Sequence, residues 1–140
     1  MIQKLFSPTS WSANANDWAS LILRLTLGLL MLSHGIPKLM KLMNGTMEFG
    51  DPIGIGVPAS LTLTVFAEVV CSLLIVIGLW TRLALIPLII TMAVAVFIVH
   101  INDDLGTMES ALMYLLCYIA LFLLGSGTYS MDSVLKRKTL

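Results

Sequence analysis

The chain has 140 residues, of which 58% are hydrophobic and only 11% are charged, and its formal net charge at pH 7 is zero. Soluble domains carry about 25% charged residues, and the mean hydropathy of this chain is +0.95. The composition excludes an ordinary soluble domain and predicts an integral protein of the lipid bilayer. It gives no reason to expect a nucleic-acid partner, because basic residues are not in excess.

Four apolar segments long enough to cross a membrane follow one another along the chain. The first holds Arg24 and lacks a small-residue cleavage site, so we expect it to be retained and not removed as a signal peptide. Short later connections predict an all-α, up-down-up-down four-helix bundle that forms a single membrane domain over residues 1–140. The predicted spans are residues 18–39, 61–79, 83–101 and 107–124, with a loop over 40–59 and a tail over 125–140.

The loop over residues 40–59 is the longest connection between the predicted spans. It is too rich in glycine and proline to form a regular helix. Loops of this length are often functional or docked on the rest of the fold. We therefore expect it to lie as a lid over one end of the bundle.

The first span combines a leucine-rich face with a stripe of small and ionisable residues. At about 100° per residue, Arg24, Gly28, Met31, Gly35 and Lys38 fall on that stripe. Ionisable groups within a membrane span are costly and normally face the interior of a bundle. The stripe therefore predicts which side of this helix packs against the other spans.

Four polar side chains, one from each span, are expected at a similar depth in the membrane. A rise of about 1.5 Å per residue across a core of about 30 Å places His34, Glu68, His100 and Tyr114 in the same third of the bilayer. Imidazole and carboxylate groups can transfer protons, and a phenol can hydrogen-bond a carbonyl. This set suits a lipid-soluble carbonyl compound such as a quinone. Two alternatives are a metal ion held by His34, Glu68 and His100, and polar side chains that only join the helices.

The basic residues predict the orientation of the bundle. Lys4, Arg82 and the basic residues 136–138 belong to one side, whereas the other side holds Lys38, Lys41 and the acidic loop residues. Because cytoplasmic segments carry an excess of lysine and arginine, both termini are expected to be cytoplasmic. The loop over residues 40–59 and the polar cluster then lie on the outer side.

The order of these features resembles the DoxX family over residues 19–133. The segments on which the resemblance rests are LRLTLGLLMLSHGIPKL, a second span with Glu68, IVIGLWTRLALIPL, His100 and GSGTYSMDS. The resemblance implies a four-helix protein of the bacterial inner membrane. Some relatives, the DoxD-type proteins, are subunits of thiosulfate:quinone oxidoreductase. The family pattern falls on Arg24, Gly28, His34, Gly35, Lys38, Glu68, Gly78, Thr81, Arg82, His100, Glu109, Gly125 and Asp132.

Residues and resemblance together predict a quinone-linked redox role, as an oxidoreductase subunit. In this hypothesis Glu68 and His34 transfer protons, while His100 and Tyr114 hold the quinone. Lys38 attracts an anionic substrate at the outer side, and Arg24 binds phosphate or pairs within the bundle. Structural roles are expected for Gly28, Gly35, Gly78, Arg82 and Gly125.

The chain carries no flavin, haem or iron–sulfur motif. Electrons would therefore come from a partner oxidoreductase subunit or from a direct reaction between a thiol and the quinone. The competing hypothesis is a non-enzymatic membrane protein, either an assembly factor, a partner-binding subunit or a small carrier. Association of the chain with further copies of itself is compatible with both hypotheses.

Overall fold

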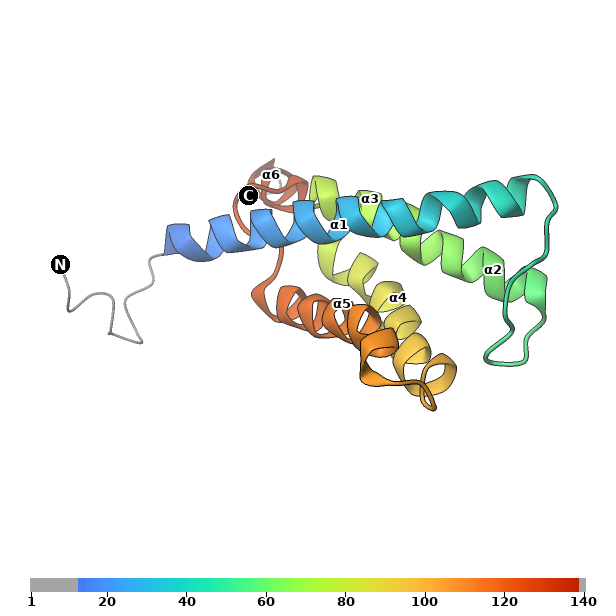
Figure 1. Cartoon of the computed structure of the whole chain (residues 1–140). Helices are drawn as coiled ribbons and strands as arrows, with labels where there is room; N and C mark the ends of the chain where they lie inside the picture. Colours follow the sequence, from blue (N-terminus) through green and yellow to red (C-terminus); the bar gives the residue numbers. More distant parts are fainter. Residues whose placement is uncertain (1–12, 139–140) are drawn as a thin grey trace.

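The computed structural model describes residues 13–138, and every regular element in that range is a helix (Figure 1). Four helical segments are long and apolar enough to cross a membrane, which confirms the predicted all-α fold with four spans. Two spans contain π-helical turns, labelled η: the second span continues through one, and the third span ends in one. The elements are α1 Ala13–Met43, α2 Val57–Val65, η2 Phe66–Cys71, α3 Ser72–Ile77, α4 Thr81–Val94, η3 Ala95–Val99, α5 Leu105–Leu124 and α6 Met131–Lys138.

The first helix is longer than the predicted span. It begins before residue 18 and continues through Pro37, and it ends only where Gly45 adopts a positive φ of 70°. There the Thr46 N–H donates to the Lys41 carbonyl, and the Gly45 N–H donates to the Leu42 carbonyl. This pair of bonds is the usual way in which a left-handed glycine closes a helix. The loop therefore begins later than expected.

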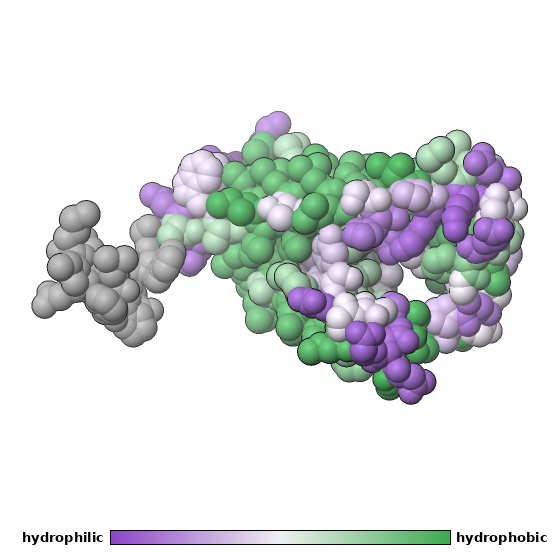
Figure 2. All heavy atoms as spheres, viewed as in Figure 1, coloured by the Kyte–Doolittle hydropathy of each residue, from purple (hydrophilic) through white to green (hydrophobic). Residues whose placement is uncertain are grey.

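The four spans pack as two antiparallel pairs (Figure 1). One pair is α1 with the span formed by α2, η2 and α3, and the other is α4 with α5. Between the pairs lies a core of fully buried side chains that includes Ile75, Leu85, Leu88, Tyr118 and Leu121. The outward sides of the spans are also apolar (Figure 2). A surface of this kind is expected where lipid replaces water.

Two glycines allow α1 to approach the second span closely. A Cβ atom at Gly35 would lie 2.9 Å from the Glu68 Cβ and 3.0 Å from the Glu68 carbonyl carbon. A Cβ atom at Gly28 would overlap the Val76 side chain. Small residues at such positions bring membrane helices into backbone contact. The structural role predicted for both glycines therefore has a direct steric basis.

The bundle has two distinct ends. The tail end contains the start of α1, the tight turn 78–80 and the carboxyl-terminal segment 125–138, in which α6 was not predicted. Asp17 accepts a hydrogen bond from the Thr128 N–H there, which joins the first and last described segments. The loop end contains segments 44–56 and 100–104.

Candidate functional site

A cavity of about 310 Å³ lies at the loop end of the bundle. Figure 2 shows the hollow between the tips of α4 and α5 and the part of the molecule that carries α2 and the long loop. All four spans and the loop contribute to its wall, and most of the lining is apolar. The lining residues are Met31, His34, Lys38, Phe49, Pro52, Ile53, Ile55, Ser60, Leu63, Thr64, Glu68, Ile90, Thr91, Met92, Val94, Ala95, Val99, Ser110, Ala111 and Tyr114.

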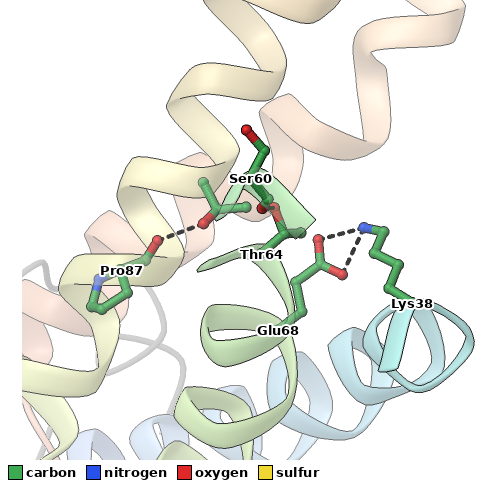
Figure 3. A network of polar contacts seen from close by, with 6 residues as sticks. Lys38, Ser60, Thr64, Glu68 and Pro87 are labelled. Carbon is green, nitrogen blue, oxygen red and sulfur yellow. Dashed lines mark hydrogen bonds and ion pairs between the residues drawn. The ribbon is translucent and has the colours of Figure 1, made fainter. Parts of the chain in front are cut away.

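An ion pair between Lys38 and Glu68 is the most polar feature of this cavity (Figure 3). The Lys38 Nζ atom lies 2.6 Å from one Glu68 carboxylate oxygen and 2.7 Å from the other. Only 3% of the Glu68 side chain is exposed, compared with 30% for Lys38. Charges inside a membrane protein are normally neutralised by such a partner. Lys38 therefore compensates a carboxylate that is otherwise enclosed.

The local backbone explains why the two charges meet. Lys38 lies about one helical turn beyond Gly35, where α1 and the second span are in backbone contact. Glu68 lies within η2, where the helix widens into a π-helical turn. Such turns often occur at functional sites. Neither π-helical segment was predicted, because hydrophobic periodicity does not distinguish a π-turn from an α-helical turn.

His34 and Tyr114 form a second contact between lining residues of the cavity. Their rings meet edge to face with centroids 6.0 Å apart, which places α1 against α5. The Tyr114 ring also lies 5.8 Å from the ring of the buried Tyr118. The structure thus brings His34, Lys38, Glu68 and Tyr114 together around one cavity.

Two threonine hydroxyl groups of the lining donate within their own helices. The Thr64 hydroxyl donates to the Ser60 carbonyl, and the Thr91 hydroxyl donates to the Pro87 carbonyl (Figure 3). Their oxygens still carry acceptor capacity toward the cavity. The Lys38 ammonium and the Tyr114 phenol, by contrast, carry donors that are available to a ligand in the cavity.

The long loop closes part of the cavity through Asp51. One Asp51 carboxylate oxygen accepts hydrogen bonds from the Ser60 hydroxyl and the Ile55 N–H, and the other accepts one from the Gly56 N–H. These bonds, the Ser60 hydroxyl foremost, hold the pKa of Asp51 below its ordinary value. They tie the loop to the start of α2, and Phe49 and three other loop residues form part of the lining.

His100 is not among the residues that line the cavity. Its Nδ1 atom lies 2.7 Å from an Asp103 carboxylate oxygen in the segment that follows η3. Within residues 13–138 no group of three histidine, cysteine, aspartate or glutamate side chains could hold a metal ion. The structure thus does not group His34, Glu68 and His100 as the alternative metal site requires, because His100 turns to a partner on its own loop.

Arg24 lies toward the tail end and does not line the cavity. Its side chain is buried, with 1% of the residue exposed. The guanidinium donates to the Tyr129 carbonyl and, at 3.5 Å, to the Ile75 carbonyl. It packs so closely on Gly78 that a Cβ atom there would overlap it. Arg24 thus joins α1, α3 and the segment before α6.

The other residues expected to be structural also gather at the tail end. Gly125 has a positive φ of 86° and lies beside the Arg82 guanidinium. Arg82 in turn lies over the Phe122 ring at 6.0 Å. The Ser20 hydroxyl donates to the Gly125 carbonyl at 2.6 Å. These contacts tie the carboxyl-terminal segment to α1 and to the start of α4.

Lys38 and Glu68 were each predicted as site residues, but their pairing with each other was not predicted. Their opposite charges and similar expected depth were the available signal, since buried charges in a membrane require partners. The contribution of the loop residues to the cavity wall had no comparable signal. It depends on the hydrogen bonds of Asp51 and not on any spacing in the sequence.

Comparison with known proteins agrees with this architecture. The DoxX family model matches residues 19–101, which is more than half of the chain. An uncharacterized membrane protein of Mycobacterium tuberculosis is 36% identical over 92 residues, covering 57% of this chain and 50% of the relative. The chain thus spans about half the length of that relative. No solved structure matches it significantly. The chain belongs to the DoxX family.

Proposed function

We propose that the cavity at the loop end binds the head group of a quinone, and that the protein serves a quinone-linked redox reaction as a membrane subunit. The observation that carries the proposal is the Lys38–Glu68 ion pair in the wall of an otherwise largely apolar cavity. Cavities that bind lipid-soluble molecules combine apolar walls with a few polar groups that orient the ligand. The lining of this cavity is mostly apolar and includes a few polar side chains.

The polar groups match the hydrogen-bonding needs of a quinone. Lys38 uses its ammonium on Glu68 but has three N–H donors, and Tyr114 has one O–H donor. Either can donate to a quinone carbonyl. In the quinol form the ligand donates instead, and the Glu68 carboxylate is the corresponding acceptor. The Lys38–Glu68 pair therefore offers hydrogen-bond partners to both redox states of the ligand.

Reduction of the quinone consumes two electrons and two protons and yields the quinol. In our proposal Glu68 and His34 relay these protons: each takes up a proton from water at the loop end and then releases it to a quinone oxygen. The electrons come from a partner oxidoreductase subunit or from a thiol reductant that is oxidised to the disulfide. The contribution of this chain is binding, orientation and proton transfer.

Quinone binding by the purified protein tests this function. We expect a short-chain quinone to bind saturably in detergent, measured by isothermal titration calorimetry. Removing one hydrogen bond costs about 1 kcal/mol, so Tyr114→Phe should weaken binding of the quinone by about fivefold. Glu68→Gln replaces the charged acceptor by a neutral one and should weaken binding of the corresponding quinol by a similar factor.

The matched control is His100→Ala, which removes an imidazole near the same end but outside the cavity wall. Its affinity for the quinone should equal that of the wild type. The proposal would be overturned by the absence of saturable binding by the wild type. It would also be overturned if the Tyr114 variant bound the quinone, and the Glu68 variant the quinol, as tightly as the wild type does.

A further inference from the structure

The short helix α6 at the tail end has two chemically different sides. At about 100° per residue, Met131, Val134 and Leu135 share one stripe, and Lys136 and Arg137 lie outside it. The apolar residues of the stripe are 45%, 42% and 45% exposed. The three basic residues that end the helix, Lys136, Arg137 and Lys138, are exposed as well. This division is typical of helices that lie in a membrane interface.

The position of α6 is fixed by its polar side. The Asp132 carboxylate accepts hydrogen bonds from the Trp80 and Thr81 backbone N–H groups, at 2.7 and 3.1 Å. The Asp132 N–H donates to the Gly78 carbonyl at 2.9 Å. These bonds hold α6 against the turn between the second and third spans. In Figure 1 the helix lies across the direction of α1, so that it runs across the axis of the bundle.

Aromatic side chains mark the level of this helix relative to the bilayer. The Trp18 and Tyr129 rings are in tilted contact at the tail end with centroids 5.0 Å apart, and both residues are exposed. Trp80, whose backbone N–H donates to Asp132, is exposed too. Tryptophan and tyrosine are enriched at the level of the lipid headgroups. Since α6 begins two residues after Tyr129, it lies at this same level.

We propose that α6 is an interfacial helix that binds the headgroups of anionic phospholipids. Its apolar stripe lies toward the acyl chains, and Lys136 and Arg137 lie among the lipid phosphates. Lys138 ends the helix in line with the stripe, and its long side chain extends to the same phosphates. Arg82, exposed at the neighbouring start of α4, adds a further positive charge at this end. The hydrogen bonds of Asp132 hold the helix in place before any lipid binds. The site is separate from the cavity at the loop end and does not depend on its ligand.

Lipid retention by the purified full-length protein tests this inference. The protein is exchanged into detergent with equal amounts of phosphatidylglycerol and phosphatidylcholine, and the retained lipids are counted by native mass spectrometry. We expect phosphatidylglycerol to be preferred. Because each basic residue near anionic lipid contributes a comparable attraction, the triple variant Lys136→Gln, Arg137→Gln and Lys138→Gln should lower that preference by about tenfold or more.

The matched control is Lys41→Gln, which removes an exposed lysine at the loop end. It should leave the preference unchanged, and thermal unfolding should show that both variants are folded. A second variant, Val134→Asp, keeps the basic residues and places a charge in the apolar stripe, and we expect it to lower retention of both lipids. Equal retention of the two lipids by the wild type, or an unchanged preference in the triple variant, would overturn the inference.

Discussion

Glu68 is the residue on which the proposed site depends most. Its carboxylate is 3% exposed and both of its oxygens lie within hydrogen-bond distance of Lys38. A buried ion pair adds little net stability over an apolar pair, but removal of one partner leaves an uncompensated charge. A gain in net stability therefore does not account for the pair. In our proposal the pair serves the binding of a polar head group.

This asymmetry predicts a specific pattern of unfolding free energies. Lys38→Met should destabilise the protein by about 2–4 kcal/mol, somewhat less than for a fully enclosed pair because Lys38 is partly exposed. The double variant Lys38→Met with Glu68→Gln removes both charges and should be more stable than Lys38→Met alone. Unfolding in mixed detergent micelles measures both quantities. A double variant less stable than Lys38→Met would contradict the interpretation of Lys38 as the partner that neutralises Glu68.

Individual ionisable residues could be identified from the sequence, but most of their partners could not. Arg24, Lys38 and Glu68 stand out because lipid disfavours charge. Their partners are a carbonyl of Tyr129 for Arg24, and each other for Lys38 and Glu68. Such contacts depend on the rotation of each helix about its own axis, which must be known to a fraction of a turn. Sequence periodicity places a residue only to within about a turn.

At the scale of elements, the contact of α1 with η2 determines the geometry of the cavity wall. The two backbones approach at Gly35, and both Lys38 and Glu68 lie next to this contact. A side chain larger than hydrogen at Gly35 would meet backbone atoms of Glu68, which have little freedom to move. The separation of the two helices beside the ion pair is therefore limited by the packing at Gly35.

We therefore predict that Gly35→Ala destabilises the protein by about 1–3 kcal/mol, the usual cost of overpacking. It should also weaken quinone binding, because α1 must move away from Glu68. The control is Gly50→Ala, since nothing lies within 4 Å of the added Cβ atom there. Thermal unfolding and calorimetric titration measure the two effects. If Gly35→Ala unfolds like the control, close packing of α1 on η2 is not required.

The elements themselves were predictable to different degrees. Four apolar runs of spanning length are a strong signal, and all four spans are present. The π-helical turns η2 and η3 were not predicted, because one additional residue in a turn leaves no mark on an apolar sequence. The helix α6 is short and has a polar composition, so it was expected only as a tail. Its position depends on hydrogen bonds between Asp132 and the turn 78–80.

At the scale of the whole molecule, the two ends of the bundle have different kinds of polar contact. The tail end uses Arg24, Asp17 and Asp132 to bind backbone groups of neighbouring segments, so its polar groups hold the chain together. The loop end directs Lys38 and Glu68 to a cavity. Between the two ends, the described spans pack on one another mainly through the apolar core. Substitutions at one end should therefore change stability independently of substitutions at the other.

The same difference between the ends bears on orientation. We propose that the protein lies in a bacterial inner membrane with its tail end in the cytoplasm, because α6 and Arg82 concentrate positive charge there. The cavity then opens toward the outer side. Its quinone would exchange protons with that side, and an electron donor in the cytoplasm would have to act across the bundle. A donor on the outer side would need no such path.

Cysteine labelling in intact cells determines this orientation. In a variant whose native cysteines are replaced by alanine, we expect Glu48→Cys at the loop end to react with a membrane-impermeant maleimide. Asn14→Cys at the tail end should react only after the membrane is permeabilised. Both residues are exposed, so both cysteines should react in detergent, which serves as the control. The reverse pattern would place the cavity on the cytoplasmic side, where a quinone bound beside Glu68 would take its protons from the cytoplasm.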